Sequence, residues 1–149
     1  MRLEEEIKQS HFKNEYQKLA VNIIYTHGWL MHKQSSFFDK FELTPSQYNI
    51  LRILRGQYPN PLSVNLLKER MLDKMSDTSR LVERLRKKGL LERKICQNDR
   101  RKADVKITEK GLTLLKEADV LDNYFIELFS KITKDEAEMI NSILDKIRD

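Results

Sequence analysis

One segment, residues 77–88, carries charged and apolar residues at a spacing that divides an expected helix into two faces. At 100° per residue, the inward face carries Thr78, Leu81, Val82 and Leu85. On the other face, guanidinium groups could donate paired hydrogen bonds to guanine or contact phosphates, and serine hydroxyls could contact phosphates or base edges. We therefore predict that this helix reads double-stranded DNA through Ser76, Asp77, Ser79, Arg80, Arg84 and Lys87. The alternative is a solvated surface on which Glu83 pairs with a neighbouring arginine.

A second group of basic residues lies on and beside an expected β-hairpin. Residues 90–96 and 102–108 have the two-residue period of half-buried strands, and the polar residues 97–101 separate them. A basic loop of this kind can insert an arginine into a narrow minor groove, where an acidic neighbour could hold the guanidinium extended. The predicted DNA contacts are Arg93, Lys94, Asp99, Arg100, Arg101 and Lys102. The alternative is a charged surface turn.

Two expected helices precede these segments. Apolar residues recur every three to four positions over residues 16–41, which predicts a helix with one buried stripe. Thr44 and Pro45 then form the cap and first position of a second helix, which Gly56 together with Pro59-Asn60-Pro61 is expected to end.

The DNA-reading helix is expected to be the second half of a helix-turn-helix. Ser63 caps a short helix that reaches Met71, and residues 72–74 form a turn. Ser76 is the expected cap of the next helix, and Gly89 ends that helix. Two short helices joined by a tight turn are the arrangement that many DNA-binding proteins use.

Charge is distributed unevenly over the 149 residues, whose net charge is +5. Residues 1–61 carry a net charge of +2, residues 62–107 carry +7, and residues 108–149 carry −4. A basic centre beside an acidic end is typical of a local polyanion site, although a solvated surface is the alternative.

The length predicts one domain, and no apolar run is long enough to cross a membrane. The acidic start without a signal-peptide pattern predicts a cytoplasmic protein, and a single cysteine excludes an internal disulfide framework.

Four motifs in order and register resemble the MarR (multiple antibiotic resistance regulator) family. They are Leu43-Thr44-Pro45-Ser46-Gln47-Tyr48, residues 79–93, Asp99-Arg100-Arg101 and residues 105–111. The resemblance implies a mainly α fold with a small β-hairpin wing, that is, a winged helix-turn-helix with long dimerisation helices at both ends. It also implies a transcriptional regulator, usually a repressor, that binds a pseudo-palindromic operator as a homodimer and leaves it when a ligand or oxidant acts. The implied regions are a dimerisation region at 1–42, a DNA-binding domain at 43–108 and a second dimerisation region at 109–149.

The C-terminal residues support a homodimer independently of the resemblance. Thr108 is expected to open a long helix over residues 108–131, and Thr133 with Glu136 forms a capping box for a last helix over residues 133–149. These helices carry more large apolar residues than a lone helical hairpin could bury, which usually marks an interface. The alternative is packing on residues 1–55 of the same chain.

An effector is implied only by the resemblance, in which small aromatic anions often bind between the dimerisation helices and the DNA-binding lobe. The residues that could line such a pocket are His27, Trp29, His32, Phe37 and Tyr48. His27 lies on the apolar stripe, so we expect it to be buried, and core packing is the alternative for both His27 and Trp29. The family's thiol sensors carry a cysteine near the N-terminus, whereas the cysteine here is Cys96, which we expect to be an inert strand residue.

Catalysis, metals and cofactors are not expected. The sequence has no phosphate-binding glycine loop, no His-Glu-x-x-His pattern and no nucleophile elbow, and its three histidines lack metal-ligand spacing. The predicted partners are therefore double-stranded DNA, a second copy of the chain and a small aromatic or anionic effector, with no membrane. Two alternatives stay open: a winged-helix protein-interaction module and a DNA-binding dimer that responds to no effector.

Overall fold

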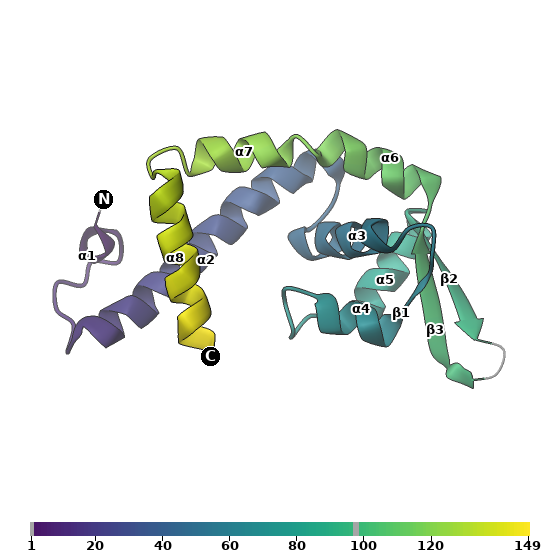
Figure 1. Ribbon diagram of the computed structural model, residues 1–149, viewed down its shortest axis with the longest axis horizontal. Coiled ribbons are helices and arrows are strands. Elements are labelled where there is room, and N and C mark those ends of the chain that lie inside the picture. Colours follow the sequence, from purple (N-terminus) through teal and green to yellow (C-terminus); the bar gives the residue numbers. More distant parts are fainter. Residues whose placement is uncertain (1, 97–98) are drawn as a thin grey trace. The chain divides into compact units, whose positions relative to one another are not determined.

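The computed structural model describes residues 2–96 and 99–149, with side chains placed for residues 2–94 and 103–149. The chain is mainly helical with one small antiparallel sheet (Figure 1), which confirms the predicted fold class. It divides into two compact units, one that ends at Leu115 and one from Lys116 to Asp149. The elements in chain order are α1 (Leu3–Glu6), α2 (Glu15–Phe38), the 3-10 helix η1 (Asp39–Phe41), α3 (Pro45–Gln57), β1 (Leu62–Ser63), α4 (Val64–Arg70), α5 (Thr78–Lys87), β2 (Leu91–Cys96), β3 (Asp99–Ile107), α6 (Glu109–Ala118), α7 (Leu121–Leu128) and α8 (Lys134–Arg148).

Side-chain caps start the helices that carry the DNA-binding lobe. The Thr44 hydroxyl accepts a hydrogen bond from the Gln47 backbone N–H, and the Gln47 side chain accepts one from the Thr44 backbone N–H. The Ser63 hydroxyl accepts a hydrogen bond from the Leu66 N–H at the start of α4, at 3.2 Å. These caps satisfy N–H groups that a helix start leaves without partners, which is why both starts were predictable.

A three-helix layer packs against the sheet to form the core of the first unit. Most of its fully buried side chains come from α3, α4, α5 and the sheet, and they include Ile50, Leu51, Leu54, Leu67, Val82, Leu85, Leu91, Val105 and Ile107. The strand order is β1-β3-β2, with all neighbours antiparallel. The sequence predicted the β2–β3 pair and missed β1, whose two residues pair with Val105 and Asp104. A two-residue strand has too short a pattern to be recognised from sequence.

The end of α5 is fixed by a glycine turn. Gly89 adopts a φ of 72°, and the Leu90 N–H donates to the Leu85 carbonyl at 3.0 Å. The Gly89 N–H donates to the Arg86 carbonyl at 2.9 Å, which completes the hydrogen-bond pair of a Schellman motif. The prediction that Gly89 ends the helix is confirmed. The turn then directs the chain into β2.

A close contact holds the start of α6 against the sheet. The Thr108 hydroxyl donates to the Gly89 carbonyl at 2.7 Å and accepts from the Gly111 N–H at 3.1 Å, so Thr108 opens the helix as predicted. A Cβ atom at Gly111 would lie 2.7 Å from the Ile107 Cγ1 atom and closer still to the Leu90 carbonyl oxygen. Only glycine therefore fits at this junction.

The single helix predicted over residues 108–131 is wrong, because the chain leaves the helix at Asp119 and Val120 and forms α6 and α7 separately. The Asp122 N–H donates to the Asp119 carbonyl three residues earlier, at 3.2 Å, rather than to one four residues earlier. Aspartate and valine are weaker helix formers than the residues around them. The apolar spacing continues across the break, so it gave no sign of an interruption.

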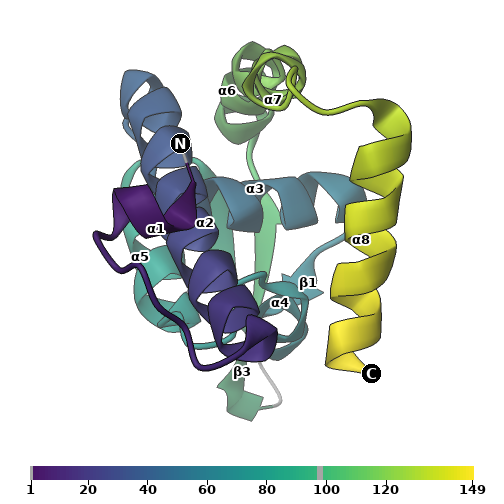
Figure 2. The same cartoon turned by 90° about the vertical axis from the view of Figure 1, so that its left-hand side faces the viewer.

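The α3 helix ends at Gln57, between Gly56 and Pro59, where the sequence predicts its end. The short helix α1 was not predicted, and Figure 2 shows that it lies beside the N-terminal half of α2. None of the described helices is long and apolar enough to span a lipid bilayer.

Candidate nucleic-acid interface

The two faces of α5 are separated as the sequence predicts. On the inner face, Val82 and Leu85 are 1% and 0% exposed, and Thr78 is also buried. On the outer face, the side chains of four predicted contacts are exposed: Ser79, Arg80, Arg84 and Lys87. The apolar half of α5 is therefore fully used in packing within the chain, which leaves the outer half available to another molecule.

The N-terminal cap of α5 is Asp77, so the prediction that Ser76 caps this helix is wrong. The Asp77 carboxylate accepts a hydrogen bond from the Arg80 backbone N–H at 3.0 Å. The Ser76 hydroxyl instead donates to the Asp73 carbonyl at 2.8 Å. Both residues are acceptable caps, and the choice depends on the turn, where the Thr78 N–H donates to the Ser76 carbonyl at 2.9 Å. As the cap, Asp77 has a structural task besides any contact with DNA.

The acidic residue on α5 pairs with Arg86. The Arg86 guanidinium donates to both Glu83 carboxylate oxygens, at 2.9 and 2.8 Å, and these hydrogen bonds hold the pKa of the Glu83 carboxyl below its ordinary value. Arg80 and Arg84 make no ion pair with any residue whose side chain the structure describes. Glu83 therefore does not neutralise the two arginines that were predicted to contact DNA.

The turn before α5 presents two apolar side chains that the sequence analysis missed. Leu72 and Met75 are 86% and 93% exposed. Their backbone is held in place, because the Leu72 N–H donates to the Asn49 side-chain oxygen and the Met75 N–H donates to the Asp73 carboxylate, each at 3.0 Å. Their exposure depends on how the turn folds, which apolar periodicity does not report.

The pairing of β2 with β3 fixes the positions of two predicted wing residues, Arg93 and Lys94. Arg93 pairs in register with Val105 and Lys94 with Asp104, and both basic side chains are exposed. The backbone of Asp99, Arg100, Arg101 and Lys102 belongs to β3, whereas their side chains lie outside the described residues, as does that of Cys96. The predicted contact between Asp99 and Arg101 therefore stays a prediction.

Comparison with known proteins finds similarity to one family of regulators. Residues 41–102 match the model of the MarR family, a range that begins just before α3 and reaches into β3. The HTH-type transcriptional regulator PapX of Escherichia coli is 27% identical over 119 residues, which are 79% of this chain and 73% of PapX. The crystal structure of a MarR transcription factor from Planctomyces limnophilus is 26% identical, has a TM-score of 0.69 and covers 91% of this chain and 98% of its own. This chain is therefore similar to MarR-family regulators, both in residues 41–102 and in its fold.

A MarR structure that contains operator DNA shares the same fold. It is a mutant MarR from Escherichia coli, 24% identical, with a TM-score of 0.79, and it covers 93% of this chain and 99% of its own. PapX is a transcriptional regulator, and the Planctomyces limnophilus protein is a transcription factor. Its described residues hold no group of His, Cys, Asp and Glu side chains that could bind a metal ion.

The residues predicted to form an effector pocket lie in different environments in this structure. Phe37 and Tyr48 are buried in an aromatic cluster, where their rings lie 5.3 and 4.3 Å from the ring centre of Phe38. His27 and His32 are exposed on α2, so the expected burial of His27 within the chain is wrong. The apolar stripe of α2 misled this prediction, because much of the stripe is itself exposed. Trp29 lines a cavity elsewhere on α2, beside α1.

Proposed function

We propose that this protein is a MarR-type transcriptional repressor that binds a pseudo-palindromic operator as a homodimer. The observation that carries the proposal is the outer face of α5, where Arg80 and Arg84 are exposed and stay apart from the Glu83–Arg86 pair. The inner face is buried, so α5 can enter a major groove without losing its packing. Arginine is the side chain best suited to paired hydrogen bonds with guanine.

The other predicted contacts divide into base-reading and phosphate-binding roles. Arg80 and Arg84 lie one turn apart on the face that would meet base edges, and Ser79 lies near the helix start. Lys87 at the other end of α5, with Arg93 and Lys94 on β2, would meet phosphates. On β3, Arg100, Arg101 and Lys102 would follow the adjacent minor groove, where a narrow groove concentrates negative potential.

An apolar contact would add to this recognition. Met75 and Leu72 are held by backbone hydrogen bonds at the start of α5 and are almost fully exposed. In the major groove, the only apolar group on a base edge is the thymine methyl. We infer that Met75 contacts a thymine methyl close to the base pair that Arg80 reads.

The homodimer is proposed from apolar side chains that the single chain leaves exposed on α2 and α8. On α2 these are Tyr16, Leu19, Ile23 and Ile24, and on α8 they are Met139, Ile140, Ile143 and Ile147. A stable monomer rarely exposes so much apolar surface, and a two-fold dimer is the commonest way to cover it. Two copies of α5 about 34 Å apart would then enter successive major grooves on one face of the DNA.

The test uses DNA from upstream of the protein's own gene and a shuffled duplex of the same composition. Fluorescence anisotropy should show upstream DNA bound with at least about a thousandfold preference, at a stoichiometry of two chains per site. A reporter driven by the same upstream DNA should be transcribed less when the protein is present. Equal affinity for both duplexes would refute sequence-specific regulation, and increased transcription would refute repression alone.

Release by a small aromatic anion is the least supported part of the proposal, because the candidate pocket residues do not gather in one place. A thermal-shift screen of aromatic acids tests it directly. A ligand at about 100 times its Kd should stabilise the protein by about 2.7 kcal/mol and weaken binding to upstream DNA. A screen without such a ligand would favour the dimer that responds to no effector.

A further inference from the structure

The helix α1 is attached to α2 by polar contacts at both of its ends. The Lys18 ammonium lies 2.6 Å from the Glu4 carboxylate, and the Tyr25 hydroxyl donates to a Glu6 carboxylate oxygen at 2.8 Å. Leu3 is buried between these contacts. The hydrogen bond from Lys18 lowers the pKa of the Glu4 carboxyl, which strengthens this attachment in its ionised form. The position of α1 beside α2 is therefore set by specific side chains.

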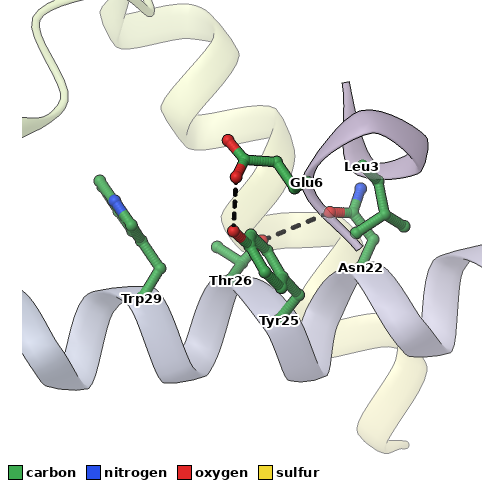
Figure 3. Close-up of a pocket in the computed structure, with 6 residues that line it drawn as sticks. All are labelled: Leu3, Glu6, Asn22, Tyr25, Thr26 and Trp29. Atoms are coloured by element: carbon green, nitrogen blue, oxygen red, sulfur yellow. Dashed lines mark hydrogen bonds between the residues drawn. The ribbon is translucent and has the colours of Figure 1, made fainter. Parts of the chain in front are cut away.

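A cavity of about 210 Å³ lies between these two helices (Figure 3). Its walls come from α1 and from one side of α2: Leu3, Glu6, Asn22, Tyr25, Thr26 and Trp29. The residues Tyr25 and Trp29 are each 37% exposed. The Thr26 hydroxyl donates to the Asn22 side-chain oxygen at 3.4 Å, which leaves the Asn22 amide N–H groups without a partner among the hydrogen bonds of this wall.

The charge of the wall determines which class of ligand fits. Glu6 is the one ionisable acid among the lining residues, and none of the six is basic, because Lys18 is paired with Glu4 outside the cavity. The Tyr25 hydroxyl occupies one Glu6 oxygen, and the other can accept a further donor. A carboxylate beside two aromatic rings attracts a cation, through charge and through the negative faces of the rings. It repels the anionic effector that the sequence predicts at Trp29.

We propose that this cavity is a binding site for a small organic cation of the substituted-ammonium class. Glu6 supplies the opposite charge, and the rings of Tyr25 and Trp29 contact the ammonium group. Asn22 and Thr26 offer hydrogen-bonding groups to a short polar arm. The volume of about 210 Å³ is sufficient for a molecule of choline's size. The proposal concerns α1 and α2 alone and does not depend on DNA binding.

The chain's single tryptophan makes the test direct, because all tryptophan fluorescence comes from the cavity wall. The probe is choline, and the control is its uncharged carbon analogue 3,3-dimethylbutan-1-ol, with sodium chloride at matched ionic strength. Choline should change the fluorescence in a saturable way and bind at least about tenfold more tightly than the neutral alcohol. Equal responses to the two compounds, or no saturable response to choline, would overturn the proposal.

Two variants that remove the same charge locate the site. Glu6→Gln keeps an oxygen that can accept the Tyr25 hydrogen bond but removes the negative charge, and choline affinity should fall about fivefold to tenfold. Glu5→Gln is the matched control, because Glu5 is exposed on the same helix and its carboxylate accepts only from the Arg2 backbone N–H, at 3.1 Å. Equal losses in both variants would show a general charge effect and refute the site.

A third variant tests the aromatic wall without relying on fluorescence. Calorimetry on Trp29→Leu should show weaker choline binding than the natural protein.

Discussion

The helices α5 and α8 are both amphipathic, but only α5 buries its apolar face within the chain. Val82 and Leu85 of α5 are completely enclosed by α3, α4 and the sheet. On α8, Ile143 is 49% exposed, and Met139, Ile140 and Ile147 are exposed as well. The difference is not one of pattern, since both sequences alternate apolar and polar residues with the period of a helix.

What differs is the surface that each helix leaves for other molecules. Because packing already uses the apolar side of α5, its free surface is charged, which suits a polyanion. The free surface of α8 includes apolar side chains, whose removal from water favours a protein partner. One chain thus carries a surface suited to DNA and another suited to a second copy of itself, which is the division that the proposed function requires.

The largest expected effect is on the surface of α8. Ile143→Lys should raise the Kd of the dimer about a thousandfold, because a two-fold interface repeats the change and each lost burial costs about 2 kcal/mol. Ser142→Lys is the matched control on the polar side of the same helix. Sedimentation equilibrium measures both. A monomeric natural protein, or equal dissociation by the two variants, would contradict the assignment of α8 to the interface.

A smaller loss is expected where the DNA-binding lobe is closely packed. Gly111→Ala would force a methyl group against the Leu90 carbonyl and Ile107, and it should lower the free energy of unfolding by about 3 kcal/mol. A Cβ atom at Gly28, on α2, would meet no atom within 4 Å. Gly28→Ala should therefore leave the free energy of unfolding unchanged or raise it slightly, because alanine favours a helix more than glycine does. Urea denaturation compares the two. Similar values for both would mean that the lobe is not tightly packed at α6.

On α5, Arg80→Ala should weaken binding to upstream DNA by about 1–3 kcal/mol and relax the preference for one base pair if Arg80 reads a guanine. The control is Arg148→Ala, which removes the same charge from an exposed position on α8. Anisotropy titrations at one salt concentration should show little change for the control. If both variants lose the same affinity, the effect comes from net charge and α5 has no special role.

The smallest predicted effect concerns Met75. Upstream DNA made with deoxyuridine in place of thymidine lacks every thymine methyl, and the natural protein should bind it more weakly. In Met75→Ala, the difference between the two DNAs should shrink by about 1 kcal/mol, because the methyl contact is already absent. The double-mutant cycle isolates this contact from changes in DNA shape. An unchanged difference would refute the contact and leave the roles of the arginines intact.

The predictable parts of the fold were those set by local chemistry. Thr44, Ser63 and Thr133 cap helices through hydrogen bonds to residues three positions away, and Gly89 ends α5 through its own φ. A single sequence contains all of this information. The break at Asp119 and the two-residue strand β1 depend on small energy differences and on distant partners, so neither left a pattern in the sequence.

The same distinction applies to the candidate site. The inward and outward faces of α5 follow from the helical period, and they were predicted correctly for Val82, Leu85, Arg80 and Arg84. The partner of Glu83 was not predictable, because Arg80, Arg84 and Arg86 all lie within reach on one helix and rotamers decide among them. The exposure of Met75 depends on an Asp73 turn that holds the backbone while the side chain projects into water.

The most direct test of the central claim, that the outer face of α5 binds DNA through free arginines, is the salt dependence of affinity. Binding of upstream DNA should be measured from low to high salt for the natural protein and for Arg84→Ala. We expect a steep straight line of log affinity against log salt, and a line that is less steep by about 1 for the variant, because one cation fewer then displaces counterions from the DNA. An affinity that does not change with salt in either protein would contradict the account.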